Sequence, residues 1–251
     1  MQEIRRIGGG GGACDTSGGL WTAFGTREGA NYSKVLSVPH IRNAAEEALH
    51  SSGLLSDLTL HQDALEHLLR LLRVLRRPRG HSVVVGAEAS EARNLAKLGA
   101  HIAGFGVEEA TPLNWREVLE NATQNMEETV LLVEASSDKA LMHRINAVLS
   151  SDEARDLHLV VLVAEDQREL LKQYPALASC ATVDQYTRLT KESLKAIAAG
   201  ALAGLPVEDS QLKEWASACV ELLQRTGGCR RKLEQQATAF RRLYERKLEQ
   251  L

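Results

Sequence analysis

The sequence predicts an α/β protein with a parallel β-sheet core covered by helices on both faces, followed by a purely helical segment. Three runs of β-branched and aliphatic residues, at 82–85, 129–133 and 157–163, have the length and composition of buried parallel strands. Segments with helical spacing of apolar residues separate these runs, and after residue 190 no strand pattern remains. This alternation favours a three-layer fold with functional sites at the carboxyl ends of the strands.

Helices are expected before the first strand and between successive strands. The helix at 63–75 has its leucines at helical spacing, and Pro78 and Gly80 end it. The other helices expected in this part are 41–52, 89–103, one within 111–125, 139–149 and 166–173. A brief fourth strand is expected at 181–183.

Three helices are expected after the last strand, at 191–203, 209–225 and 230–251. The last helix has a narrow, heptad-like apolar seam and a net positive charge. The seam consists of Leu233, Ala237, Phe240, Tyr244 and Leu251. We expect this helix to project from the core and to leave the seam partly exposed for one helical partner.

Composition divides the chain and limits its function classes. The glycine run at 8–12 predicts disorder over residues 1–31, because ordering glycine costs much backbone entropy. The remaining predicted units are an α/β domain at 32–190, a lid-like helical segment at 191–228 and a stalk-like helix at 229–251. A formal charge of −3 and 4% aromatic residues argue against nucleic-acid binding, and no apolar window is long enough for a membrane span.

The four cysteines argue against a metal centre. Cys14, Cys180, Cys219 and Cys229 form no CxxC pair and have no zinc-like spacing to a histidine. No apolar stretch typical of a signal peptide follows the first basic residues. We therefore expect free thiols in an intracellular setting and no bound metal.

The strand at 82–85 leads into an altered phosphate loop. A working loop reads G-x-x-x-x-G-K-[ST], in which backbone amides and the lysine hold the phosphates and the hydroxyl binds Mg²⁺. Gly86 fills the first position, but Glu91, Ala92 and Arg93 replace the second glycine, the lysine and the hydroxyl residue. The carboxylates of Glu88 and Glu91 would repel phosphate, and Ser90 does not lie in a nucleophile-elbow motif. The sequence therefore predicts no bound ATP or other cofactor and no catalytic residue.

Several segments, in order, resemble the fourth AAA+ module of dynein heavy chains. A helix of the type DA-x-x-H-x-x-R-x-x-R-x-L followed by PRG leads to Gly86, and the strand at 130–134 ends in an acidic, Walker B-like residue, Glu134. The residues matching the first pattern are Asp63, Ala64, His67, Arg70, Arg73, Leu75, Pro78, Arg79 and Gly80. Residues 145–151 and 174–184 resemble the I-N-x-L-L-A-S and F-P-A-L…I-D segments of the family.

The resemblance implies an AAA+, P-loop NTPase-like core and a role in microtubule-based motor assembly. Because the loop is altered and only Arg168 or Lys172 remains where the family has an arginine-rich run, we expect a non-catalytic module. The implied partners are dynein-type heavy, intermediate or light chains or axonemal components, at a cilium or sperm flagellum or elsewhere on the cytoskeleton. We expect Glu134 to cap the following helix or to face solvent.

Two other functions remain open from the sequence. One is an ATP-binding motor module with a non-standard loop, and the other is a stand-alone scaffold whose last helix forms a coiled coil. The resemblance also implies that the chain is a short form or fragment, because a dynein ring contains six such modules.

Overall fold

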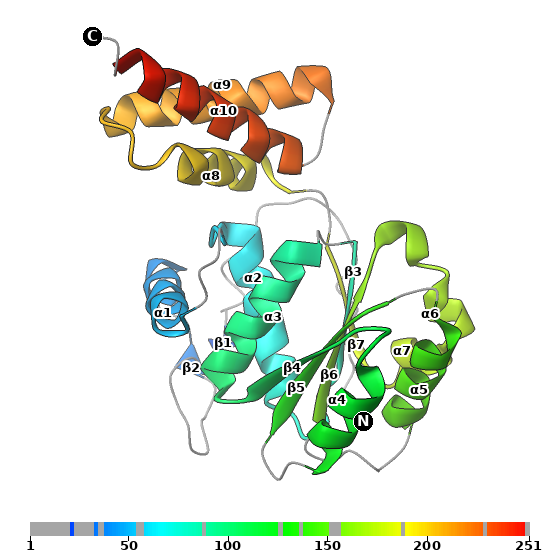
Figure 1. Ribbon diagram of the computed structural model, residues 1–251. Helices are drawn as coiled ribbons and strands as arrows, with labels where there is room; N and C mark the ends of the chain where they lie inside the picture. The colour runs from blue at the N-terminus through cyan, green and yellow to red at the C-terminus, as the bar shows by residue number, and fades with distance from the viewer. Residues whose placement is uncertain are drawn as a thin grey trace.

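The computed structural model describes residues 21–22, 33–34, 38–53, 58–86, 89–124, 128–135, 138–150, 157–186, 189–227 and 230–248. A five-stranded sheet lies between two layers of helices, and three more helices form a unit beyond the carboxyl ends of the strands (Figure 1). The predicted disordered segment 1–31 lies outside the described residues except for β1 (Trp21–Thr22). At those two residues the structure differs from the prediction, because β1 pairs antiparallel with β2 (Ser33–Lys34).

The sheet is parallel throughout, with strand order β4-β5-β6-β3-β7. Its strands are β3 (Ser82–Val85), β4 (Gly106–Ala110), β5 (Thr129–Glu134), β6 (Leu157–Val163) and β7 (Thr182–Gln185). The prediction that β3, β5 and β6 share one parallel sheet is confirmed. The edge strand β4 was not predicted, because its sequence GVEEA has two glutamates and lacks the aliphatic run of a central strand.

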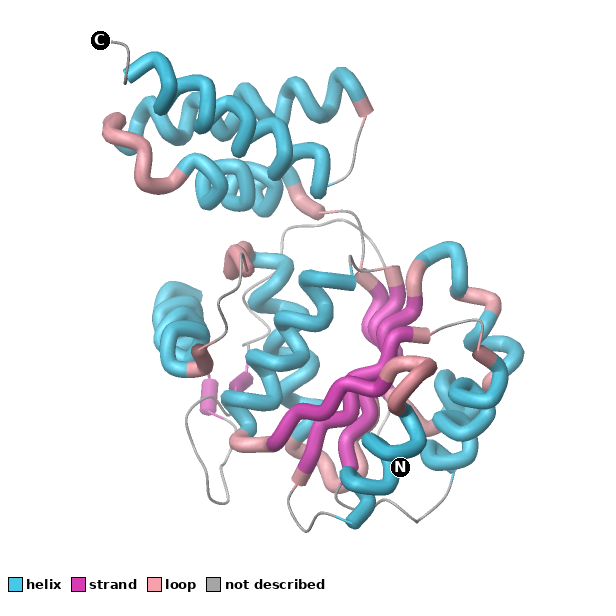
Figure 2. Tube along the Cα trace, in the orientation of Figure 1, coloured by secondary structure: helices cyan, strands magenta, loops and turns pink. Residues whose placement is uncertain are grey.

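Helices cover both faces of the sheet (Figure 2). One layer contains α1 (Val38–Ser51), α2 (Gln62–Leu75) and α3 (Ala89–Ala103); the other contains α4 (Trp115–Gln124), α5 (Lys139–Ser150), α6 (Leu170–Gln173) and α7 (Pro175–Ser179). The single helix expected at 166–173 is wrong: a 3-10 turn at Glu165–Gln167 precedes the short α6. The segment 165–179 therefore folds as three short pieces, of which α7 packs into the core on the α5 side.

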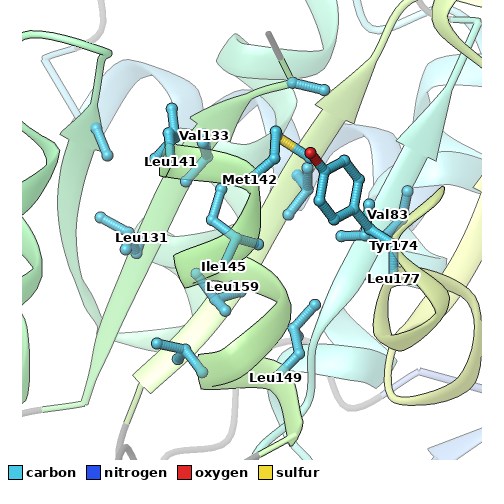
Figure 3. Packing of buried hydrophobic residues seen from close by; sticks show 14 of the residues in the cluster. Val83, Leu131, Val133, Leu141, Met142, Ile145, Leu149, Leu159, Tyr174 and Leu177 are labelled. Carbon is cyan, nitrogen blue, oxygen red and sulfur yellow. The ribbon is translucent and has the colours of Figure 1, made fainter. Parts of the chain in front are cut away.

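Strand alternation divides the core between the two layers. In β5 and β6, odd-numbered residues such as Leu131 and Leu159 face α5, whereas even-numbered residues such as Leu132 and Val160 face α3. Figure 3 shows the α5 side, where Leu141, Met142, Ile145 and Leu149 of α5 pack among sheet residues with Tyr174 and Leu177. Because both faces are covered, the central strands need apolar residues at every position.

The last three helices, α8 (Lys191–Leu202), α9 (Asp209–Thr226) and α10 (Arg230–Leu248), pack on one another; we call them the helical unit. α10 does not lie on the sheet, but Leu233 and Ala237 of its predicted seam are buried against α8 and α9. This differs from a helix projecting alone. Phe240 keeps 39% of its surface exposed, and Leu251 lies outside the described residues.

Candidate functional site at the carboxyl ends of the strands

Gly86 and residues 89–93 of the predicted altered phosphate loop lie at the carboxyl edge of the sheet, at the end of β3 and the start of α3. Gly86 has φ +80°, and a Cβ there would stand 2.6 Å from a carboxylate oxygen of Glu165 and 3.2 Å from the carbonyl oxygen of Tyr186. The backbone conformation therefore favours glycine, and an added Cβ would also lie close to the Tyr186 carbonyl. Glu165, which follows β6, was not singled out by the sequence because only the fold brings it to Gly86.

Glu91 lies buried in the first turn of α3 and is bound on both carboxylate oxygens. Its Oε1 is 2.9 Å from His61 Nε2, and its Oε2 pairs with Arg230 Nη1 at the start of α10. His61 Nδ1 accepts a hydrogen bond from the amide of Ala64, so Nε2 carries the proton and donates to Glu91. Arg230 also donates through Nε to Glu234 at 2.7 Å.

These partners keep Glu91 ionised. Burial alone would raise its pKa, but the hydrogen bond from His61 and the charge of Arg230 outweigh burial and hold the pKa of Glu91 below its ordinary value. For Arg230, burial would lower the pKa, but Glu91 and Glu234 together outweigh burial and raise the pKa. The pair is therefore a charged contact between the α/β core and the helical unit.

Arg93 connects three elements at the same edge of the sheet. Its Nη2 donates to Glu134 at the end of β5, and its Nε lies 3.3 Å from Glu109 of β4. Lys97, one turn further along α3, also binds Glu109. Of the two roles expected for Glu134, the half-exposed side chain fits facing solvent rather than capping α5, because Asp138 accepts the first amides of that helix.

The other described residues singled out at the loop and near the arginine-rich run lie in separate environments and do not bind one another. Ala92 is buried in the apolar cluster beneath α3, where it provides packing but no cation. Ser90 is exposed in the first turn of α3, and Glu88 lies outside the described residues. Arg168 contacts Glu165 and Gln185, and Lys172 binds Glu169, so the two basic residues expected near the family's arginine-rich run are paired locally.

A second polar cluster ties α2 to β7. Asp184 accepts from Arg70 Nη1 at 3.0 Å and lies 2.7 Å from His67 Nδ1, while the ring of Tyr186 stacks on His67 at 3.5 Å. Burial would raise the pKa of Asp184, but His67 and then Arg70 outweigh it and lower this pKa. The sequence pattern included His67, Arg70 and Asp184 but did not indicate that they bind one another.

The described residues offer little for metal or membrane chemistry. Within them, no three His, Cys, Asp or Glu side chains gather closely enough to hold a metal ion. No helix in the described part of the chain is long and apolar enough to cross a membrane. The described side chains at this edge of the sheet include carboxylates paired with arginines.

Comparison with known proteins finds similarity to dynein heavy chains. Residues 56–161 match the family model described as the P-loop containing dynein motor region D4. Dynein axonemal heavy chain 2 of Mus musculus is 23% identical over 235 residues, covering 69% of this chain, and the flagellar outer-arm dynein alpha chain of Chlamydomonas reinhardtii is 29% identical over 141 residues, covering 50%. This chain is similar to the dynein heavy chains over these residues. It spans only 5% and 3% of those two relatives.

The dynein match covers the loop residues and the acidic strand end of the candidate site. Residues 56–161 include the altered loop from Gly86 to Arg93 and the acidic strand end at Glu134. They do not include Arg230, which reaches the loop from the helical unit. Glu91 therefore lies within the matched residues but is bound by Arg230 of α10, which lies outside them.

Proposed function

We propose that this chain is a non-catalytic AAA+-like dynein module that acts in microtubule-based motor assembly through contacts with other proteins. The observation that carries this proposal is the pairing of Arg93 with Glu134. In a working site the hydroxyl of the loop and the acidic Walker B residue hold Mg²⁺ between them. Here Arg93 stands at the sequence position of the hydroxyl residue and binds Glu134 directly, which supports the proposal that the two residues would not hold a metal ion.

The surrounding charges also disfavour phosphate. Ala92 supplies no ammonium group for the phosphates, and Arg93 is bound to two carboxylates. Glu165 stands against Gly86, where the loop backbone would have to approach the phosphates. Glu91 has both oxygens bound, yet it still adds negative charge at the second glycine position.

Nucleotide binding and hydrolysis test the non-catalytic role. In the presence of Mg²⁺, we expect no saturable binding of a fluorescent ATP analogue at analogue concentrations up to about 1 mM. This corresponds to a binding free energy weaker than about −4 kcal/mol. We also expect no phosphate release. The triple variant Glu91→Gly, Ala92→Lys, Arg93→Thr restores the loop residues and serves as the matched control. Turnover by the unaltered chain that disappears in Glu134→Gln would support the alternative, an ATP-binding motor module.

The proposed partners are dynein-type heavy, intermediate or light chains or axonemal components, and the proposed site of action is a cilium or flagellum, including that of sperm. Support comes from the axonemal and flagellar relatives. Cross-linking of the full chain in ciliated cells should enrich dynein subunits over an unrelated protein of the same size and charge. Equal recovery from both would contradict this assignment.

The alternative of a coiled-coil scaffold has weaker support. Leu233 and Ala237 are buried within the helical unit, so a partner helix could reach only the later part of the seam. Truncation after Gly227 followed by a pull-down distinguishes the two roles. Partner capture that requires only α10 would favour the scaffold.

A further inference from the structure

We propose that Glu91, Arg230 and His61 form a latch that holds the helical unit closed on the α/β core in the absence of any nucleotide. The latch joins the altered loop to the first turn of α10, which lie far apart in the sequence. The role goes beyond the proposed lack of catalysis, because it assigns to these residues the task of fixing the relative position of two parts of the chain.

Two other contacts between the helical unit and the core lie at the two ends of α8. At the start of α8, the amide and hydroxyl of Thr190 donate to Asp63 at 3.0 and 3.2 Å. Near its end, Gly200 approaches Thr59 so closely that a Cβ would stand 3.1 Å from the Thr59 hydroxyl. Contacts along one helix still permit rotation about that helix.

The Glu91–Arg230 contact removes this rotation because it is made by α10, a different helix packed beside α8. Three contacts that do not share one line fix a rigid body. The helical unit therefore needs no ligand between itself and the core to hold its position.

The latch is preorganised on both sides. His61 begins α2, and its bond to the amide of Ala64 fixes the tautomer that donates to Glu91. Glu234 holds the guanidinium of Arg230 from one turn further along α10. Only 6% of the Glu91 side chain and 10% of the Arg230 side chain are exposed. Removing Arg230 leaves the buried Glu91 charge with the His61 hydrogen bond alone, and removing Glu91 leaves Arg230 with Glu234 alone.

The distance between the two parts in solution tests the latch. Spin labels go on Cys180, which is exposed beside β7, and on α9 through Lys213→Cys, with Cys14→Ser, Cys219→Ala and Cys229→Ser removing the other thiols. In nucleotide-free buffer we expect a single narrow distance distribution. Arg230→Gln and Glu91→Gln should each broaden it at least twofold, and Arg230→Lys should restore part of the narrow population.

A matched ion pair supplies the control. Arg241 binds Glu245 on the same helix at 2.9 Å, so Arg241→Gln removes an α10 pair that does not reach the core and should leave the distribution narrow. A broad distribution in the unaltered chain, or a narrow one in both latch variants, overturns the proposal. Circular dichroism separates release from unfolding, and loss of helix content in both variants would also overturn it.

This outcome is independent of the proposed function. The distance is measured without nucleotide, so ATP binding by the unaltered chain would refute the non-catalytic role and leave the latch standing. A narrow distribution that appears only after Mg²⁺-ATP is added would refute both.

Discussion

His81, just before β3, is buried as a neutral side chain. It is 4% exposed, and its Nδ1 accepts a hydrogen bond from the amide of Leu159 at 3.1 Å. Burial, followed by the positive charges of His158 and Arg79, lowers the pKa of His81 to about 4. In the unfolded chain the pKa is about 6.5, so the unfolded state binds more protons between these two values.

We therefore expect stability to fall as the pH drops from 6.5 to 4, with His81 contributing about 3 kcal/mol of the loss. The variant His81→Asn keeps an acceptor for the Leu159 amide but cannot titrate. Urea unfolding at pH 7 and pH 4.5 should show a smaller loss for the variant. Carboxylates with lowered pKa values, such as Glu91 and Asp184, act in both proteins, so an equal loss in both would rule out His81 as the cause.

Gly86 and Gly53 differ in what surrounds them, although both have positive φ. An added Cβ at Gly86 meets Glu165, whereas one at Gly53 meets no atom within 4 Å. We expect Gly53→Ala to lower the free energy of unfolding by about 1 kcal/mol through backbone strain alone. Gly86→Ala should cost about 1–3 kcal/mol more, as measured by urea unfolding. Equal costs would show that the close approach to the Tyr186 carbonyl and to Glu165 contributes nothing.

At the scale of elements, aromatic packing holds the far end of α10. Trp215 of α9 contacts Phe240 and Tyr244 with ring centroids 5.0 and 5.2 Å apart. The double change Phe240→Ser, Tyr244→Ser should destabilise the helical unit by about 2–4 kcal/mol, because both rings are only partly buried. Hydrogen exchange should show faster exchange in α8 to α10 and unchanged protection in β3, β5 and β6.

The exposed Leu243 provides the control for that change. It is 62% exposed on the same helix, so Leu243→Ser should alter stability by no more than about 0.5 kcal/mol. Loss of protection in the sheet strands after the aromatic changes would mean that the helical unit and the core unfold together.

At the scale of the whole molecule, the described residues form two separate sets of apolar clusters. The sheet and its covering helices contain one set, the helical unit contains the other, and no residue belongs to both. Trp115 packs against the first set and Trp215 against the second. Each tryptophan can therefore report the unfolding of one part.

We expect two urea transitions rather than one. All variants carry Trp21→Phe, so that each keeps a single tryptophan after one further change. The Trp115→Phe variant reports on Trp215, and the Trp215→Phe variant reports on Trp115. We expect the fluorescence of Trp215 to change at the lower urea concentration, because the helical unit has the smaller core. Glu91→Gln should shift the Trp215 transition more than the Trp115 transition. Coincident transitions in all variants would show that the parts unfold as one.

The sequence by itself determined the α/β class, the three central strands and most helices. Their apolar runs and helical periodicities are local signals that act over a few residues. The edge strand β4 and the short turns near Glu165 gave no such signal, because neighbouring strands and helices decide their conformation. The replaced loop residues Glu91, Ala92 and Arg93 were also evident from the sequence, since each position in the motif has a defined task.

Only the tertiary structure decided what those residues contact. Glu91 binds His61 and Arg230, and Arg93 binds Glu109 and Glu134, through pairs of residues that lie far apart along the chain. An ion pair leaves no periodic pattern in a sequence, because either partner can be met by any opposite charge that the fold brings within reach. The parallel sheet brings the strand ends to one edge, and the packing of α10 on α8 places Arg230 there.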